Sequence, residues 1–255
     1  MTNTAPYSLL ISDLHLCDAH QDLTAAFQHF CKEKATQAEA LFILGDLSDA
    51  WVGDDDDGDT ANTIRQTLKT VAAQGTAVYL MSGNRDFLMG AQLAEDCGAS
   101  VLADPSVVNL HGNDALLLHG DSLCIDDSEY MAFRAQIQNP SAQQILLSKP
   151  LEERRQIAAM LRSQSKSANS NKAEDIMDVN QDEVVKQLEN ANVKLMIHGH
   201  THRPAEHELQ IASGTAKRLV LGDWGESIWY IKADQQGQTL HSYPATTNEN
   251  ELEQA

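Results

Sequence analysis

Short apolar runs alternate with amphipathic stretches along the first 120 residues of this 255-residue chain. The runs at 7–12, 41–44 and 77–81 are brief and almost continuous, which is typical of strands buried on both faces. Between and after them, apolar side chains recur at helical spacing, so we expect helices at 21–35, 60–73 and about 87–96, the last ended by Gly98. This alternation predicts parallel strands joined by right-handed crossovers.

The pattern changes after this alternating region. Residues 106–110 and 115–118 predict a hairpin, whereas 129–170 carry no strand signal and indicate two or three helices. By composition alone, 163–172 would be a linker. A helix at 182–190 follows, then short strands at 194–197, 207–211, 218–221, 227–231 and 239–242, and a polar tail at 246–255 that we expect to be frayed. We therefore predict one α/β sandwich over 1–245 with a helical insertion at about 126–172.

Five of the apolar runs end in side chains that bind metals. These side chains are Asp13, His15, Asp46, Asn84, His119, His200 and His202. Ligands in open α/β sheets bind outside the carboxyl ends of the strands, so the side chains should converge at one place. Asp13 and His15 are two residues apart on an extended segment and point to the same face, and the same holds for His200 and His202. Carboxylate, imidazole and amide together suit Mn²⁺, Fe or Zn²⁺ better than Ca²⁺.

The formal charge of −19 argues against nonspecific nucleic-acid binding. The charge is uneven, however, because 126–172 holds seven basic side chains against five acidic ones. A local positive segment on an acidic body favours a phosphate-bearing partner or an anionic membrane surface. Nothing in the sequence indicates an obligate protein partner.

The remaining composition favours a cytosolic globular protein. With 42% apolar residues the chain can form a core, but no stretch reaches the roughly 18 apolar residues that a membrane span needs. The first residues lack the basic region of a signal peptide. The four cysteines show no CxxC spacing, so we expect free thiols in a reducing compartment.

Taken in order along the chain, the ligand motifs resemble those of the calcineurin-like metallophosphoesterases. The matching pieces are Asp13-Leu14-His15, Gly45-Asp46-Leu47-Ser48-Asp49, Gly83-Asn84-Arg85-Asp86, His119 and Gly199-His200-Thr201-His202. The resemblance implies an αββα sandwich and two metal ions bridged by Asp46. Asp13, His15 and His202 would complete one site, and Asn84, His119 and His200 would complete the other.

Further motifs are similar to those of the UDP-2,3-diacylglucosamine hydrolases of bacterial lipid A biosynthesis. They are Trp51-Val52-Gly53-Asp54-Asp55, Gly83-Asn84-Arg85-Asp86-Phe87 and Ile176-Met177-Asp178-Val179-Asn180, together with the insertion. The resemblance implies cleavage of the pyrophosphate of UDP-2,3-diacylglucosamine to 2,3-diacylglucosamine 1-phosphate (lipid X) and UMP. It also implies two Mn²⁺ per chain, and a peripheral position on the cytoplasmic face of the bacterial inner membrane.

In this family the insertion would be a lid that holds the acyl chains. The resemblance implies substrate contacts through Asn84, Arg85, Asp127, Ser165, Asn169, Lys172 and His200, and catalytic roles for Asp46, Asn84, Arg85 and His200. These contacts overrule the linker expected from composition at 163–172. Glu152 and Glu153 depart from the apolar or basic residues expected in this part of the insertion, which argues against strong membrane attachment through this turn.

Arg85 occupies a position where many members of the superfamily carry a histidine general acid. An arginine does not deprotonate near neutral pH, so it cannot act as an ordinary acid, but it can bind a phosphate through two parallel hydrogen bonds. A leaving group that needs little protonation, such as a second phosphate, fits this difference.

Several readings stay open. The acidic run at 54–59 fails the spacing of a calcium-binding loop, so we expect it to cap the helix from Thr60. The family resemblance gives weak support for contacts of Asp54 and Asp55 near the metal site. Arg154, Arg155 and Arg162 could be a solvated helix face or could bind phosphate. The apolar residues of the insertion, Met160 among them, could form its core or line a groove. The alternatives for function are a soluble nucleotide-sugar pyrophosphatase or phosphodiesterase of the same superfamily, and a non-catalytic scaffold.

Overall fold

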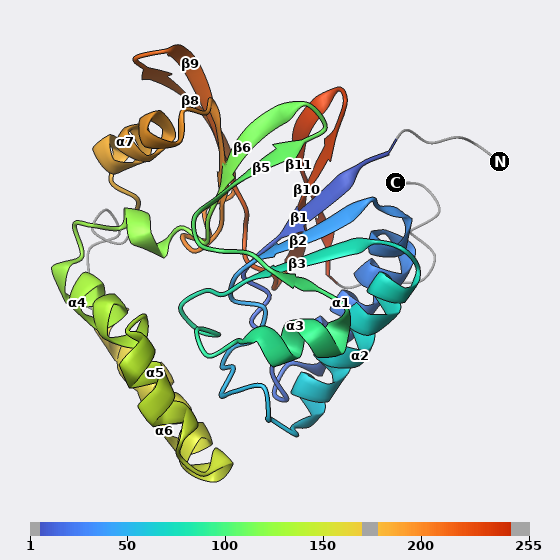
Figure 1. Cartoon of the computed structure of the whole chain (residues 1–255), viewed down its shortest axis with the longest axis vertical. Helices are drawn as coiled ribbons and strands as arrows, with labels where there is room; N and C mark the ends of the chain where they lie inside the picture. The colour runs from blue at the N-terminus through green and yellow to red at the C-terminus, as the bar shows by residue number, and fades with distance from the viewer. Residues whose placement is uncertain (1–5, 170–177, 246–255) are drawn as a thin grey trace.

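Two β-sheets packed face to face form the centre of the computed structural model, which describes residues 6–169 and 178–245 (Figure 1). The first sheet has the strand order β11-β10-β1-β2-β3-β4 and the second the order β5-β6-β7-β9-β8. Helices α1–α3 lie on the outer side of the first sheet, and α7 packs beside the second. The predicted αββα sandwich is therefore confirmed.

Parallel strands form the middle of each sheet, and antiparallel strands lie at one edge of the first sheet and at both edges of the second. In the first sheet β1 (Ser8–Ile11), β2 (Ala40–Leu44), β3 (Ala77–Met81) and β4 (Ser100–Val101) are parallel, and the antiparallel pair β10 (Ser227–Asp234) and β11 (Gly237–Pro244) extends it. In the second, β6 (Asn113–Leu117), β7 (Leu195–His198) and β9 (Gly214–Val220) are parallel. They lie between the antiparallel edges β5 (Ser106–Leu110) and β8 (Ala205–Ile211).

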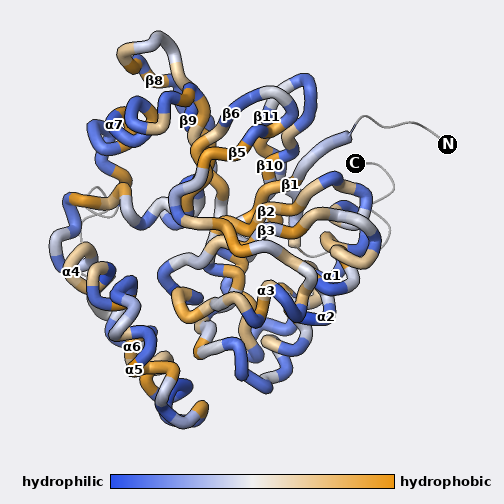
Figure 2. The backbone as a smooth tube through the Cα atoms, in the orientation of Figure 1, coloured by the Kyte–Doolittle hydropathy of each residue, from blue (hydrophilic) through white to orange (hydrophobic). Residues whose placement is uncertain are grey.

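Alternate residues of the buried strands divide the apolar core into three layers. Leu41 and Ile43 of β2 face a cluster that also contains residues of α1 (Gln21–Glu33), α2 (Asp59–Ala73) and α3 (Ala91–Cys97). Phe42 and Leu44 point to the cluster between the sheets. Leu116 of β6 faces a third cluster under α7 (Gln181–Ala191). The continuous apolar runs exist because both faces of these strands are buried, as the hydropathy colouring of the central strands shows (Figure 2).

The insertion forms three helices, α4 (Ser128–Ile137), α5 (Pro140–Leu147) and α6 (Leu151–Asn169), that stand beside the sandwich (Figure 1). Helix α6 continues through 163–169, so the linker expected there from composition alone is wrong. Lys172, the tail at 246–255 and the Asn169 side chain lie outside what the structure describes. Within the described residues, no helix is long and apolar enough to cross a membrane.

The acidic run at 54–57 does not cap α2, contrary to the expectation from sequence. The N-cap of α2 is Gly58, whose position offers no side-chain cap. Instead Asp18 accepts hydrogen bonds from the backbone and hydroxyl of Thr60, at 3.2 and 2.5 Å. Helix α3 begins later than expected, at Ala91, but ends as predicted, with Gly98 in the left-handed conformation.

Candidate metal centre and the lid beside it

The segments that carry the metal-binding side chains turn sharply where they leave the strands. Seven non-glycine residues of the described chain have positive φ, and five of them belong to the predicted ligand set: Asp13, His15, Asp46, His200 and His202, with φ between 49° and 68°. This left-handed region is uncommon for residues with a Cβ, and such residues gather at functional sites. These turns aim side chains from three loops at one place.

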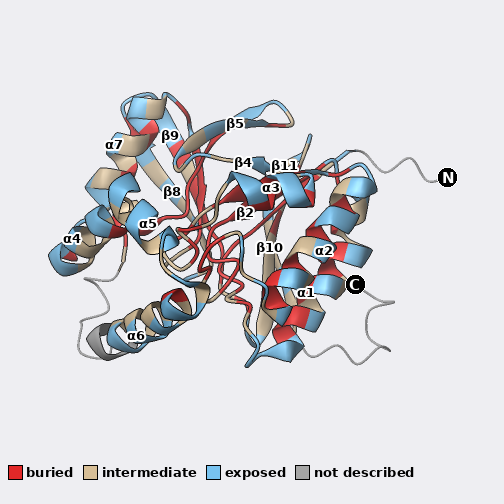
Figure 3. Ribbon diagram, turned by 60° about the horizontal axis from the view of Figure 1, so that its bottom comes forward, coloured by how far each residue is buried: buried red, intermediate tan, exposed pale blue. Residues whose placement is uncertain are grey.

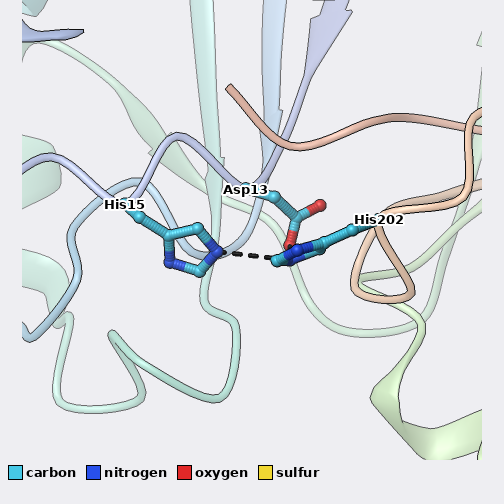
Figure 4. A group of neighbouring side chains, drawn as sticks. All are labelled: Asp13, His15 and His202. Atoms are coloured by element: carbon cyan, nitrogen blue, oxygen red, sulfur yellow. Dashed lines mark hydrogen bonds and ion pairs between the residues drawn. The ribbon is translucent and has the colours of Figure 1, made fainter. Parts of the chain in front are cut away.

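Asp13, His15 and His202 form one group of possible ligands (Figure 4). Nε2 of His15 lies 3.3 Å from Nε2 of His202, which in turn lies 3.5 Å from Oδ1 of Asp13. Burial lowers the pKa of His15 to about 3, so its ring is neutral and keeps a lone pair at neutral pH. Asp13 Oδ1 and His15 Nδ1 are buried and hydrogen-bond to no other described atom. Buried acceptors of this kind fit a cation.

Asn84, His119 and His200 form a second group. Oδ1 of Asn84 lies 3.0 Å from Nε2 of His119 and 2.9 Å from Nδ1 of His200. The other ring nitrogen of His119 donates to the carbonyl oxygen of Leu44 at 2.9 Å, which directs Nε2 into the site. Burial lowers the pKa of His200 to about 3, so this ring is also neutral.

Asp46 stands between the two groups. One carboxylate oxygen lies 3.7 Å from Nε2 of His119, and the other lies 4.0 Å from Nδ1 of His15. The oxygen that faces His119 also accepts a hydrogen bond from the backbone of Arg85 at 2.8 Å. Burial raises the pKa of Asp46 to about 7, although His119 acts in the opposite direction. Burial makes the ionised carboxylate of Asp46 unfavourable by itself, and bound cations would stabilise it. Because the carboxylate also faces both groups, it fits a position between two cations.

The calcineurin-like phosphoesterase family model matches residues 8–204, a segment that contains every one of these ligands. The chain belongs to the calcineurin-like phosphoesterases. Asp13, Asp46 and His119 also lie close enough together to share a cation, and with the family and the first group they indicate divalent metals.

Curated relatives of this phosphoesterase are named UDP-2,3-diacylglucosamine hydrolase. The Cellvibrio japonicus protein is 49% identical over 92% of this chain and 98% of its own length. The Marinobacter nauticus protein is 50% identical over 89% and 93%, and a Pseudomonas aeruginosa protein is 45% identical over 92% and 98%. The resemblance that the motifs indicated is thus confirmed.

Metal binding by the phosphoesterase should release a proton from His119. Burial alone would lower the pKa of His119, but the carboxylates of Asp46, Asp13 and Asp121 together raise it to about 10. The metal-free ring is therefore protonated at neutral pH, and a metal at Nε2 must displace that proton. We expect the apparent metal affinity to rise about tenfold per pH unit between about pH 7.5 and 9, above the pKa of Asp46 and below that of His119. Chelator competition across this range measures it, and a flat profile would contradict the assignment of His119.

Asp86 supports the site, a role that its sequence position alone does not reveal. It is fully buried and accepts backbone hydrogen bonds from Leu47 at 2.8 Å and from Gly83 at 2.5 Å. It therefore ties the loop of Asp46 to the loop of Asn84. In the sequence, only its place in the Gly83–Asp86 motif indicates this role. Gly83 must lack a side chain, because a Cβ there would lie 2.2 Å from Oδ1 of Asp46.

The helical insertion, expected from the resemblance to be a lid, borders a cavity of about 250 Å³, which we call the lid pocket. Its apolar lining includes Trp51, Phe87, Phe133, Leu146, Ile157 and Leu161. The metal centre opens into a larger, more polar cleft of about 730 Å³. The two spaces share lining residues, among them Asn84, Arg85, Tyr130, Arg162 and Ser165. Met160, which the sequence analysis considered for a groove, is instead exposed.

Lid residues reach the metal centre at three points. Arg85 donates to the hydroxyl of Ser165 at 3.1 Å, and Arg162 pairs with Asp49 at 2.5 Å. Asp127 forms the N-cap of α4, where it accepts from the backbone of Tyr130 at 2.9 Å, and it lines the cleft. Among the predicted substrate residues, Asp127 and Ser165 therefore lie near the metal ligands. The sequence analysis missed Tyr130 and left Arg162 open, because neither belongs to a recognisable motif.

His198 lies next to the Gly199–His202 motif but is occupied by other contacts. Its Nδ1 donates to the carbonyl oxygen of Gly199 at 2.8 Å, and its Nε2 accepts from Arg218 at 3.2 Å. Both ring nitrogens are therefore used in structural hydrogen bonds.

Proposed function

We propose that this phosphoesterase hydrolyses the pyrophosphate bond of UDP-2,3-diacylglucosamine, releasing 2,3-diacylglucosamine 1-phosphate and UMP, with two Mn²⁺ ions. The observation that carries the proposal is the junction between the apolar lid pocket and the polar metal cleft, which share Asn84, Arg85 and Ser165. A lipid-linked nucleotide sugar needs such a junction, because its acyl chains lie a short distance from the anhydride to be cleaved. The names of the relatives support the same substrate.

The ligand chemistry supports two ions of the Mn²⁺ class. Four histidines with two carboxylates and one amide make a mixed nitrogen and oxygen set, and Asp46 faces both halves of it. Asp13, His15 and His202 would hold one ion and Asn84, His119 and His200 the other, with Asp46 shared. When bound, such ions supply an acidified water and offset the charge of the phosphates.

The chain's own residues bind and orient the pyrophosphate. We propose that Arg85, which is half-buried, directs its guanidinium at a phosphate from the wall that the two cavities share. Asp127 and Ser165 would contact the glucosamine side, and Asn169 and Lys172 would extend these contacts. His200 would lie against the reacting phosphate. These roles follow from the matched motifs and the position of the lid.

We propose that the enzyme works peripherally at the cytoplasmic face of the inner membrane. Ile145 and Leu147 of α5 are exposed apolar side chains of the insertion. Exposed apolar side chains on a helix favour contact with a bilayer surface, where the lipid substrate resides.

Product analysis tests the function. The purified enzyme would be given UDP-2,3-diacylglucosamine and, separately, UDP-N-acetylglucosamine, each with Mn²⁺, and UMP release would be measured. Cleavage of the diacyl substrate with little cleavage of the other supports the proposal. Equal cleavage of both would favour a general nucleotide-sugar pyrophosphatase instead.

Substitutions of Arg85 should distinguish phosphate binding from acid catalysis. We expect Arg85→Ala to lower kcat/KM by roughly 10- to 100-fold, the loss of one hydrogen bond to a charged group of about 1.5–3 kcal/mol. Arg85→Lys should recover part of this, because the charge survives but the two-pronged geometry does not. Arg85→His should be poor at neutral pH and improve only as the ring becomes protonated below about pH 6.5. Full activity of Arg85→His at about pH 8 would show that a proton donor is what this position needs.

A further inference from the structure

Three arginines of helix α6 form ion pairs with the sandwich. Among the residues of α6 whose side chains the structure describes, 151–165, only Arg154 is buried. The other side chains of 151–165 are exposed or half-buried (Figure 3). A helix that buries an arginine rather than an apolar stripe depends on what that arginine binds.

The guanidinium of Arg154 is bound on several sides. One terminal nitrogen donates to the carbonyl oxygen of Val52 at 2.5 Å and to Oδ1 of Asp55 at 2.7 Å, and the other donates to Oδ2 of Asp55. Its Nε donates to the carbonyl oxygen of Lys149 at 3.0 Å. Arg154 thus joins the lid to the loop after β2 with a two-pronged ion pair, which is the strongest arrangement for these groups.

The neighbouring side chains repeat this attachment. Arg155 donates to Asp56 at 2.5 Å and to Asp57 at 2.7 Å. Gly53 leaves room for the pair beside it, because a Cβ there would lie 2.2 Å from the Arg154 nitrogen. The Trp51–Asp55 motif and the acidic run at 54–57 therefore contact the lid. Neither has a direct role in the proposed reaction.

The loop that receives these arginines is fixed to the sandwich. Asp54 accepts backbone hydrogen bonds from Gly90 and Leu93 at the start of α3, both at 3.0 Å, and one from the indole of Trp51 at 2.9 Å. Arg65 of α2 donates to the backbone carbonyls of Asp54 and Asp56, each at 2.7 Å. Hydrogen bonds thus anchor the loop to α2 and α3, although the side chains of Asp55 and Asp57 face water.

We propose that Asp55 and Arg154 form an ionic latch that positions α6 over the metal centre. Arg162 and Ser165 lie eight and eleven residues beyond Arg154, about 12 and 16 Å further along the same helix. Any tilt of α6 about the latch displaces these two residues and opens the lid pocket. Asp55 and Arg154 are thus positioning residues for the lipid substrate, and this role rests on the function proposed above.

The burial of Asp55 and Arg154 determines how strongly the latch holds α6 in place. Exposed ion pairs contribute little, and the Asp55 side chain is 64% exposed, but the Arg154 side chain is only 4% exposed. Removing the charge of Asp55 leaves a buried cation with two carbonyl partners, which favours movement of the helix into water. The latch should therefore be stronger than its exposed carboxylate suggests.

Steady-state kinetics of Asp55→Asn, Arg154→Gln and the double variant test the latch. With the diacyl substrate we expect each single variant to lose roughly 10- to 100-fold in kcat/KM, mostly through KM, and the double variant to lose no more than the worse single one. Hydrolysis of bis(p-nitrophenyl) phosphate, which needs no acyl pocket, should stay within about twofold of wild type. Asp59→Asn makes the same charge change in a neighbouring exposed residue and should behave as wild type.

Hydrogen exchange of the α6 amides gives a readout that is independent of the substrate. Protection should fall in Asp55→Asn and remain in Asp59→Asn. Unchanged protection together with unchanged diacyl kinetics in Asp55→Asn would overturn the latch, as would additive losses in the double variant. If the wild type does not cleave the diacyl substrate, the proposed function fails, and the exchange data alone still decide the latch.

Discussion

Asp46→Asn is expected to remove nearly all hydrolysis of both the diacyl substrate and a small phosphodiester. Its carboxylate is the group that faces both ligand clusters, so the substitution withdraws one negative charge from two sites at once. Changing a group that merely supports a metal ligand costs 10–100-fold, so we expect a loss on the order of 10³-fold or more here. Metal content should also fall from that of the wild type, as measured by elemental analysis of the purified protein.

Asp55→Asn is the matched control for this substitution. It also removes one carboxylate charge from the loop after β2, but Asp55 contacts Arg154 rather than the metal ligands. It should keep wild-type metal content and wild-type turnover of the small diester. Near-wild-type turnover and metal content in Asp46→Asn would refute the shared position of Asp46.

Removing the outer part of the lid should separate the two substrates. We expect replacement of residues 140–169 by a short Gly/Ser linker to abolish cleavage of the diacyl substrate, since Leu146, Ile157 and Leu161 of the pocket wall are lost. The small diester should still be hydrolysed at a measurable rate, because all seven proposed metal ligands remain. The truncated protein should stay folded, since no strand is removed. Circular dichroism and assays with both substrates measure the outcome.

The structure sets the boundary of this truncation. A deletion of the whole insertion would also remove Tyr130 and Arg134, which donate to the buried Asp121 at 2.7 and 2.8 Å. Asp121 would then be a buried carboxylate without these partners, at a cost in stability unrelated to the substrate. The narrower deletion avoids this. Retention of diacyl activity by the truncated enzyme would contradict the proposed role of the lid.

Local pattern was sufficient to predict the sandwich and to select its ligand residues. The continuous apolar run at Leu41–Leu44 predicts a buried strand, and both faces of β2 are indeed buried. Asp46 follows directly after this run, where the chain turns out of the sheet. The order of the motifs then indicated the family, and the structure brings the same seven side chains together. Their roles, and those of the substrate residues, stay predictions.

Sequence could not determine how the lid is attached. The acidic run at 54–57 was expected to cap a neighbouring helix, and 163–169 had the composition of a linker. Asp55 and Arg154 are 99 residues apart, and nothing in either segment indicates the other. A strand or a metal ligand is recognisable from its neighbours in the chain, because period and spacing are local properties. A salt bridge between a loop and an inserted helix depends on where the tertiary structure places them, and only the folded chain determines that.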